Sequence, residues 1–167
     1  MLASIYINAR NEAEEMLQKG FERTKILTHL VNAAEQAAGS DAVVSILVLD
    51  NEGLLRNGAS PKLPPDYLKA IDGIKPDANV GTCAAAAATG KMVITPSFYA
   101  DNKWSELRHL PTAIGFVGAW SMPIIKEEKV LGTFGTYFRQ HREPSFEEIT
   151  GIRLLAETAA LVLTAEN

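Results

Sequence analysis

The side chains most able to do chemistry are three histidines, His29, His109 and His141, and they are scattered along the chain. No two of them stand at the spacing that a metal site needs, and no HExxH pattern occurs. His109 lies in a segment expected to border a pocket, but a lone histidine does not make a metal site. We therefore expect each histidine to be structural or solvated, and we expect neither a metal nor a cofactor.

Cys83 is the one cysteine of the chain, which excludes an intramolecular disulfide and any multi-cysteine metal site. A helix is expected to begin near this residue, and a helix N-terminus can activate a thiol by favouring the thiolate. The plainer interpretation is a small buried residue in an alanine-rich helix. Nucleophilic catalysis also needs a base within hydrogen-bond reach and a third group to orient that base, and the sequence offers no such set. We expect that the protein is not an enzyme.

The helix beside Cys83 is predicted from Thr82, a candidate N-cap, to Gly90, a candidate stop. Alanine is the best helix former, and its small side chain lets a helix approach a sheet closely. The free amide groups of the first turn, together with the Thr82 hydroxyl, could hold an anion. The alternative is that water or Thr82 itself satisfies these amides.

The elements that must position these residues follow from the apolar pattern. A helix is predicted over about 8–38, continuous or in two pieces that meet near Gly20, and a final helix over about 145–165, where Ser145 and Glu148 stand at capping-box spacing. A short helix is predicted from Pro65. The predicted strands cover 42–49, 54–57, 91–95, 116–125 and 130–138. Helices at both ends over one face of an antiparallel sheet make an α+β domain. We expect a single domain over 1–167, with its sheet and pocket in 42–138.

Composition limits the classes of partner. The chain has 167 residues and a net charge of −4, and its basic residues are dispersed, so nucleic-acid binding is not expected. The N-terminus lacks the pattern of a signal peptide, and no window approaches the roughly 20 apolar residues of a membrane span. We expect a cytoplasmic protein with no membrane partner.

Three segments resemble a GAF domain of the bacterial signal-transduction type: VGTCAAAAATGK (80–91), ADNKWSEL…GFVGAWSMPI (100–124) and KVLGTFGTYFRQHREPSFEEI (129–149). Two positions depart from the pattern of that family. Ala84 stands where the family has a second glycine, and Val117 stands where it often has an arginine. The second departure could change which ligand is held.

Relatives that bind larger cofactors resemble this chain less. Bilin-binding GAF domains attach the chromophore to a cysteine commonly followed by histidine, but Cys83 is followed by Ala84. Cyclic-nucleotide GAF domains carry an acidic pair where this chain has Trp120 and Ser121. Haem would want a proximal ligand, for which His109 is the one candidate.

The resemblance implies a central antiparallel sheet of about six strands, with terminal helices on one face and a pocket under short helices and loops on the other. It also implies a homodimer formed through the terminal helices. Stand-alone GAF proteins that act as nitrate receptors are similar in size and hold a small anion with backbone amides. By this resemblance, the expected ligand-binding residues are those near the start of the alanine-rich helix and four apolar residues after it: Thr82, Cys83, Ala84, Trp104, Leu110, Ile114 and Trp120.

Two classes of function remain open once the enzyme class is set aside. The first is a sensor that binds a small anion, such as nitrate, or a polar metabolite, and passes its occupancy through the terminal helices to a partner such as a histidine kinase. The second is a ligand-free dimerisation module. The chain could also be the detached sensory domain of a larger sensor kinase or cyclic-dinucleotide enzyme.

Overall fold

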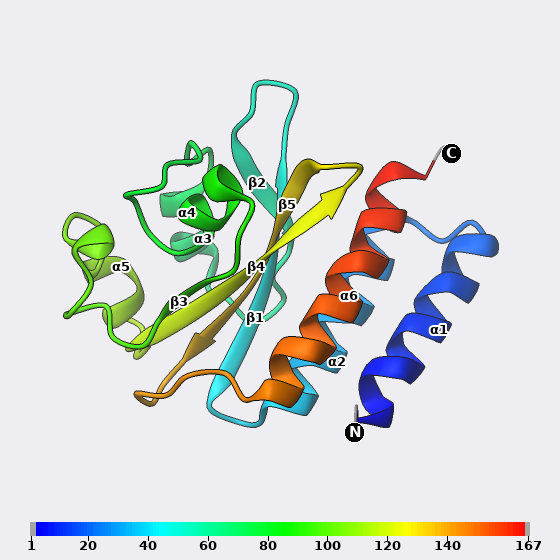
Figure 1. The fold of residues 1–167 in the computed structure, drawn as a ribbon, viewed down its shortest axis with the longest axis horizontal. Coiled ribbons are helices and arrows are strands. Elements are labelled where there is room, and N and C mark those ends of the chain that lie inside the picture. Colours follow the sequence, from blue (N-terminus) through cyan, green and yellow to red (C-terminus); the bar gives the residue numbers. More distant parts are fainter. Residues whose placement is uncertain (1–2, 166–167) are drawn as a thin grey trace.

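The computed structural model describes residues 3–165 and shows one antiparallel sheet between two layers of helices (Figure 1). Its strands are β1 (Ala42–Leu49), β2 (Leu55–Ala59), β3 (Val93–Thr95), β4 (Gly118–Lys126) and β5 (Lys129–Phe138). They lie in the order β2-β1-β5-β4-β3, and each neighbouring pair is antiparallel. The α+β fold class is confirmed. The sheet has the five strands predicted from the apolar runs, rather than the about six implied by resemblance.

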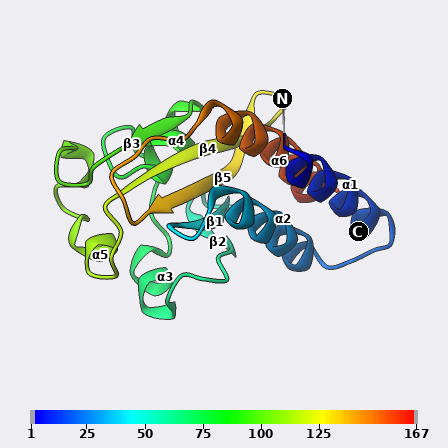
Figure 2. The same ribbon diagram turned by 90° about the horizontal axis from the view of Figure 1, so that it is seen from below.

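Three long helices form the layer on one face: α1 (Ser4–Gln18), α2 (Arg23–Ala38) and α6 (Phe146–Thr164). Figure 2 shows them side by side along that face. The predicted N-terminal helix is thus two helices, and the chain breaks at Gly20, where φ is +80°. Helices α2 and α6 pack on the sheet, and α1 packs on both of them. A Cβ atom on Gly151 of α6 would come within 2.5 Å of the Tyr6 ring, so the close approach of α1 requires glycine there.

The last helix begins as the sequence predicts. Ser145 and Glu148 form a complete capping box: the Glu148 amide donates to the Ser145 hydroxyl at 3.1 Å, and the Ser145 amide donates to Glu148 Oε1 at 3.0 Å. The apolar residues along one side of this helix are buried, except for Ile149, which is half-buried; the buried ones are Ile152, Leu155, Ala156, Ala159 and Val162. Buried side chains from α1, α2, α6 and the sheet form the larger core of the domain.

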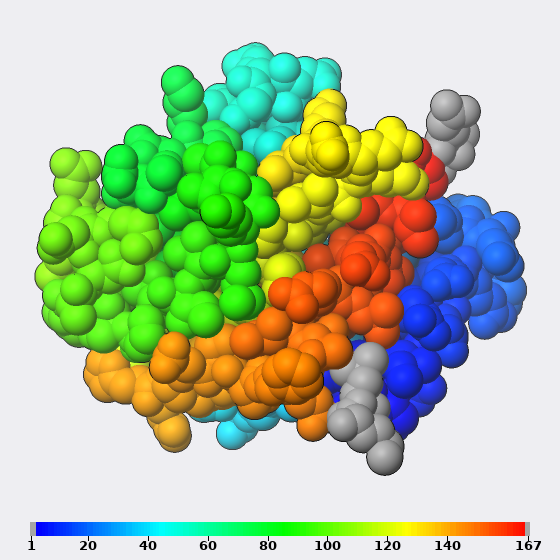
Figure 3. All heavy atoms as spheres, in the orientation of Figure 1, coloured from blue at the N-terminus to red at the C-terminus, as the bar shows by residue number. Residues whose placement is uncertain are grey.

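The opposite face of the sheet carries α3 (Pro65–Ile71), α4 (Cys83–Thr89), a 3-10 helix η1 (Asn102–Trp104) and α5 (His109–Thr112). Gly90 ends α4 in the left-handed conformation, with φ at +66°, as predicted for its stop. A second, separate core cluster fills the space between these elements and the sheet. Figure 3 shows the middle segment, in green, on the far side of the molecule from the terminal helices.

None of the helices within residues 3–165 combines the length and the apolar character needed to cross a membrane. The same residues hold no group of three or more His, Cys, Asp or Glu side chains that could bind a metal ion.

Candidate functional site

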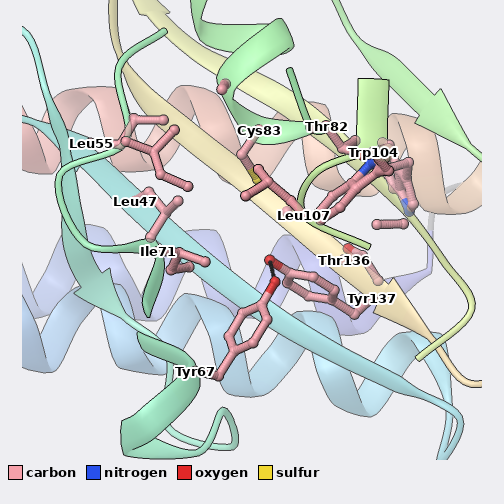
Figure 4. Close-up of a pocket in the computed structure, with 16 residues that line it drawn as sticks. Leu47, Leu55, Tyr67, Ile71, Thr82, Cys83, Trp104, Leu107, Thr136 and Tyr137 are labelled. Carbon is pink, nitrogen blue, oxygen red and sulfur yellow. Dashed lines mark hydrogen bonds between the residues drawn. The ribbon is translucent and has the colours of Figure 1, made fainter. Parts of the chain in front are cut away.

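An internal cavity of about 30 Å³ lies between the sheet and the segments that carry α3, α4 and η1 (Figure 4). This volume admits two or three molecules the size of water. The walls are mainly aliphatic and aromatic, and no Lys, Arg, His, Asp or Glu is among the 16 lining residues. They are Leu47, Leu55, Tyr67, Ile71, Ile74, Gly81, Thr82, Cys83, Ala84, Trp104, Leu107, Ala119, Trp120, Gly135, Thr136 and Tyr137.

Five of the seven residues expected from the sequence line this cavity: Thr82, Cys83, Ala84, Trp104 and Trp120. The structure does not place the other two there. Leu110 and Ile114 are half-buried and pack against the second core cluster, but neither contributes to the cavity wall. The turn after η1 instead directs Leu107 into the cavity, three residues before Leu110 along the chain. From this segment the sequence therefore selected Trp104 correctly, but it selected Leu110 and Ile114 in place of Leu107.

Trp120 lines the cavity, but its side chain lies on the other face of the sheet. Successive side chains of a strand point to opposite faces of the sheet. Ala119 is part of the cluster on the cavity side, whereas Trp120 is part of the core beneath the helices. Trp120 therefore contributes backbone to the cavity, and its indole Nε1 is buried without a hydrogen-bond partner within the described residues.

Thr82 does not cap α4, contrary to the prediction from the sequence. Its backbone is in the helical region, and its side chain makes no capping hydrogen bond. The hydroxyl is used elsewhere: it accepts from Trp104 Nε1 at 2.8 Å and lies 2.9 Å from the Thr95 hydroxyl. Thr95 in turn donates to Asp101 Oδ2 at 3.3 Å. Thr82 therefore ties α4 to the edge strand β3 and to η1.

The first turn of α4 still offers amide groups next to the cavity. Helix α4 has only seven residues, and within residues 3–165 no acceptor is found for the amides of Cys83 and Ala84. Both residues line the cavity. These amides are the part of the predicted anion site that the structure retains.

Cys83 lines the cavity next to the sheet. A Cβ atom on Gly135 would lie 2.8 Å from its sulfur, so the absence of a side chain at Gly135 makes room for the thiol. Burial raises the pKa of this thiol, and the hydroxyls of Ser121 and Thr133 only partly oppose that effect. The helix start therefore does not activate Cys83 in the way that a low-pKa nucleophile requires.

Two tyrosines that sequence analysis did not select meet in the cavity wall. Tyr67 on α3 donates its hydroxyl to the hydroxyl oxygen of Tyr137 on β5, at 2.8 Å, and the two rings are edge to face. Both side chains are 4% exposed. Burial raises the pKa of each hydroxyl, so both tyrosines are neutral. Strand alternation could have placed Tyr137 on the face opposite Phe138, but no sequence signal pairs it with Tyr67.

The histidines lie away from this cavity. His29 is on α2, with Nε2 3.6 Å from Glu12 Oε2. His109 is exposed at the start of α5, and His141 is exposed with Nδ1 3.4 Å from the carbonyl oxygen of Pro96. His109 thus lies in the segment beside the cavity, but it does not line the cavity.

By sequence, this chain is similar to the methyl sulfide methyltransferase-associated sensor of Methanosarcina acetivorans. It is 35% identical over 159 residues, which cover 94% of this chain and 16% of that sensor. The chain thus spans about a sixth of the length of this relative.

Solved structures under 25% identical share the fold. The reduced form of fRMsr from Staphylococcus aureus has a TM-score of 0.72 at 12% identity, with 95% of each chain covered. The GAF domain of an Acinetobacter phosphoenolpyruvate-protein phosphotransferase has a TM-score of 0.69 at 16% identity, covering 97% of this chain and 94% of that one. A domain assigned to a two-component sensor histidine kinase of Sinorhizobium meliloti has a TM-score of 0.65 at 21% identity, with coverages of 79% and 83%.

The family comparison agrees with the fold and with the three segments singled out in the sequence. The model described as GAF domain matches residues 22–164, which include the whole sheet, the cavity and both of the helices that pack on the sheet. This chain belongs to the GAF domain family.

Proposed function

We propose that this chain is a sensory GAF domain that binds a small ligand in its internal cavity and signals through its terminal helices. The observation that carries the proposal is a small internal cavity walled by residues from four strands and three helices, on the opposite side of the sheet from the terminal helices. Ligand pockets combine apolar walls with a few polar groups that fix orientation, and this cavity has that composition. The proposal includes the cytoplasmic location predicted from the sequence.

The ligand class proposed from the sequence is a small anion, such as nitrate, or a small polar metabolite. The free amides of Cys83 and Ala84 support an anion, since amide groups at a helix start favour negative charge. The cavity volume of about 30 Å³ restricts either class to a few heavy atoms. Binding rather than catalysis is proposed because the thiol pKa is raised and no histidine lines the cavity.

The signalling part of the proposal uses the layer of α1, α2 and α6. Two of these helices pack directly on the sheet whose other face forms the cavity floor. The curated relative is a sensor, and one of the structural neighbours is a domain assigned to a sensor histidine kinase. We propose a partner of that class, and a homodimer formed through the terminal helices.

A thermal-shift experiment tests ligand binding. Nitrate, nitrite, formate, acetate and methyl sulfide at millimolar concentration are the probes, because a ligand that binds only the folded state raises the Tm. Leu107→Phe fills the cavity and should abolish any shift. The matched control is Leu110→Phe on the same segment, which lies outside the cavity and should leave the shift intact. A shift that survives Leu107→Phe would place binding elsewhere and contradict the proposal.

The second candidate, a ligand-free dimerisation module, is favoured by the small volume of the cavity. It predicts that no small molecule changes the Tm and that Leu107→Phe stabilises the domain by filling a void. It shares the prediction of self-association, which sedimentation of the wild-type chain measures directly. Hydrogen exchange of α6 with and without a binding probe separates the two candidates, since only the sensor predicts a change in that helix.

A further inference from the structure

The hydroxyls of Tyr67 and Tyr137 carry two protons, and their mutual hydrogen bond uses one of them. Tyr67 donates to Tyr137 at 2.8 Å, and no acceptor for the Tyr137 proton is found in the part of the chain that the structure describes. If the bond is reversed, the Tyr67 proton is left over instead, so one free donor remains in either arrangement. Figure 4 shows the two hydroxyls meeting at the edge of the cavity, beneath Cys83 and Leu107.

This free donor is buried, because both tyrosines are 4% exposed and both line the cavity. A buried donor without an acceptor is unfavourable, since it loses its hydrogen bond to water and gains nothing in return. The cavity is the space next to it in which an acceptor can be placed. A ligand that presents an acceptor atom there would satisfy this proton.

The charge of the walls selects between ligand classes. No cationic side chain lines the cavity, and a buried anion is costly unless it is paired or fully hydrogen-bonded. The polar network behind Thr82 ends on an acidic group, because Thr95 donates to Asp101. Lys103 Nζ pairs with the same carboxylate oxygen, Asp101 Oδ2, at 2.9 Å, so the charge of Lys103 is already engaged.

Aliphatic side chains make up a large part of the remaining wall. Leu47, Leu55, Ile71 and Leu107 surround the space opposite the hydroxyl pair. A ligand with one acceptor and an otherwise apolar surface matches this division. The volume of about 30 Å³ limits it to a few heavy atoms.

We propose that the cavity is selective for small uncharged molecules that present one acceptor group, such as a carbonyl, sulfoxide or nitro group, to the Tyr67–Tyr137 pair. This inference rests on the proposed sensing function and decides between its two ligand classes. It assigns the specificity to the tyrosine hydroxyls rather than to the amides of α4.

Nitromethane and acetate make a matched pair of probes, since they have the same shape and number of heavy atoms and differ in charge. Acetone is the carbonyl probe and nitrate the second anion, with ionic strength held constant. Nitromethane and acetone should raise the Tm of the wild-type chain in a concentration-dependent way. Acetate and nitrate should need at least about fivefold higher concentrations to give the same shift in Tm.

The double variant Tyr67→Phe/Tyr137→Phe tests the hydroxyls themselves. It removes both partners of a buried hydrogen bond and keeps both rings, a change that is close to neutral for stability. Affinity for nitromethane and acetone should fall about fivefold or more, which corresponds to the loss of one hydrogen bond. Tyr99→Phe is the matched control, because Tyr99 is 61% exposed and outside the cavity.

The possible failures are distinguishable. Shifts with nitrate or acetate that equal or exceed those with nitromethane would overturn this inference and leave the sensing function standing. Binding of the neutral probes that is unchanged in the double variant would overturn the role of the tyrosines alone. No shift with any probe would overturn the inference, and together with stabilisation by Leu107→Phe it would also count against sensing.

Discussion

Tyr137 and Phe138 are neighbours on β5, and their side chains lie on opposite faces of the sheet. Tyr137 lines the cavity, whereas Phe138 belongs to the core beneath the terminal helices. The guanidinium carbon of Arg142 lies 3.9 Å from the centre of the Phe138 ring. Two consecutive residues of β5 thus contact the cavity and the junction between the sheet and the helices.

Arg142 joins the elements of that junction. Its guanidinium donates to both carboxylate oxygens of Glu148 on α6, at 2.8 and 3.2 Å, to Asp41 at 3.1 Å and to the carbonyl oxygen of Ala38 at the end of α2. We predict that Arg142→Gln lowers the free energy of unfolding by about 2 kcal/mol, because charged hydrogen bonds at a partly buried site are lost together. Chemical denaturation measures this.

The control for that prediction is Arg153→Gln. Arg153 is exposed on α6, and no ion pair or hydrogen bond of its side chain is found within residues 3–165. This variant should stay within about 0.5 kcal/mol of the wild type. An equal change in the free energy of unfolding for the two variants would show that the contacts of Arg142 do not stabilise this junction.

Thr82 provides a second prediction. Thr82→Val removes the hydroxyl that accepts from Trp104 and contacts Thr95, and it leaves two buried polar groups with fewer partners. The expected loss is about 1–3 kcal/mol in the free energy of unfolding. Thr82→Ser keeps the hydroxyl and should recover most of that loss. A stable Thr82→Val protein would show that this network does not hold α4 in place.

Asp101 makes stability depend on acid pH. Partial burial acts to raise the pKa of its carboxyl, but hydrogen bonds from the Lys103 side chain and amide, and from Thr95, outweigh burial and lower it. As the pH falls, the Asp101 carboxylate therefore takes up a proton in the unfolded chain before it does so in the folded one. Its contribution to the free energy of unfolding is present above the ordinary pKa of 3.8 and is lost below it. Asp101→Asn should reduce stability at pH 7 by about 1 kcal/mol or less after solvent screening. The difference from the wild type should shrink in denaturation curves taken towards pH 3.

Cys83 makes stability depend on alkaline pH. Because burial raises its pKa above the ordinary value of 9.0, the thiol ionises first in the unfolded chain. The contribution of the neutral thiol to the free energy of unfolding is therefore complete below pH 9. It is lost as the pH rises further, by at most about 1.4 kcal/mol per pH unit. Cys83→Ala removes this dependence, so the wild type should lose stability faster than the variant between pH 9 and pH 10.5. Parallel curves for the two proteins would contradict a buried, neutral thiol.

Much of the fold could be predicted because its signals are local. The capping box at Ser145, the left-handed stop at Gly90 and the break at Gly20 each depend on backbone conformation within one turn. The apolar runs predicted each strand to within a few residues, since strand length and burial follow from composition. The resemblance of three segments to GAF domains was confirmed by the family match over residues 22–164.

The sequence by itself determined the long helices, the five strands, their order along the chain, and the position of the α4 and η1 segments beside the cavity. The tertiary structure alone decided which side chains face it: Leu107 rather than Leu110, and Thr82 bonded to Thr95 and Trp104 rather than capping its own helix. It also brought together Tyr67 and Tyr137, which are 70 residues apart along the chain. Spacing within an element sets which residues share a face, but the distance between two elements depends on how both pack against the sheet, and no local pattern encodes that.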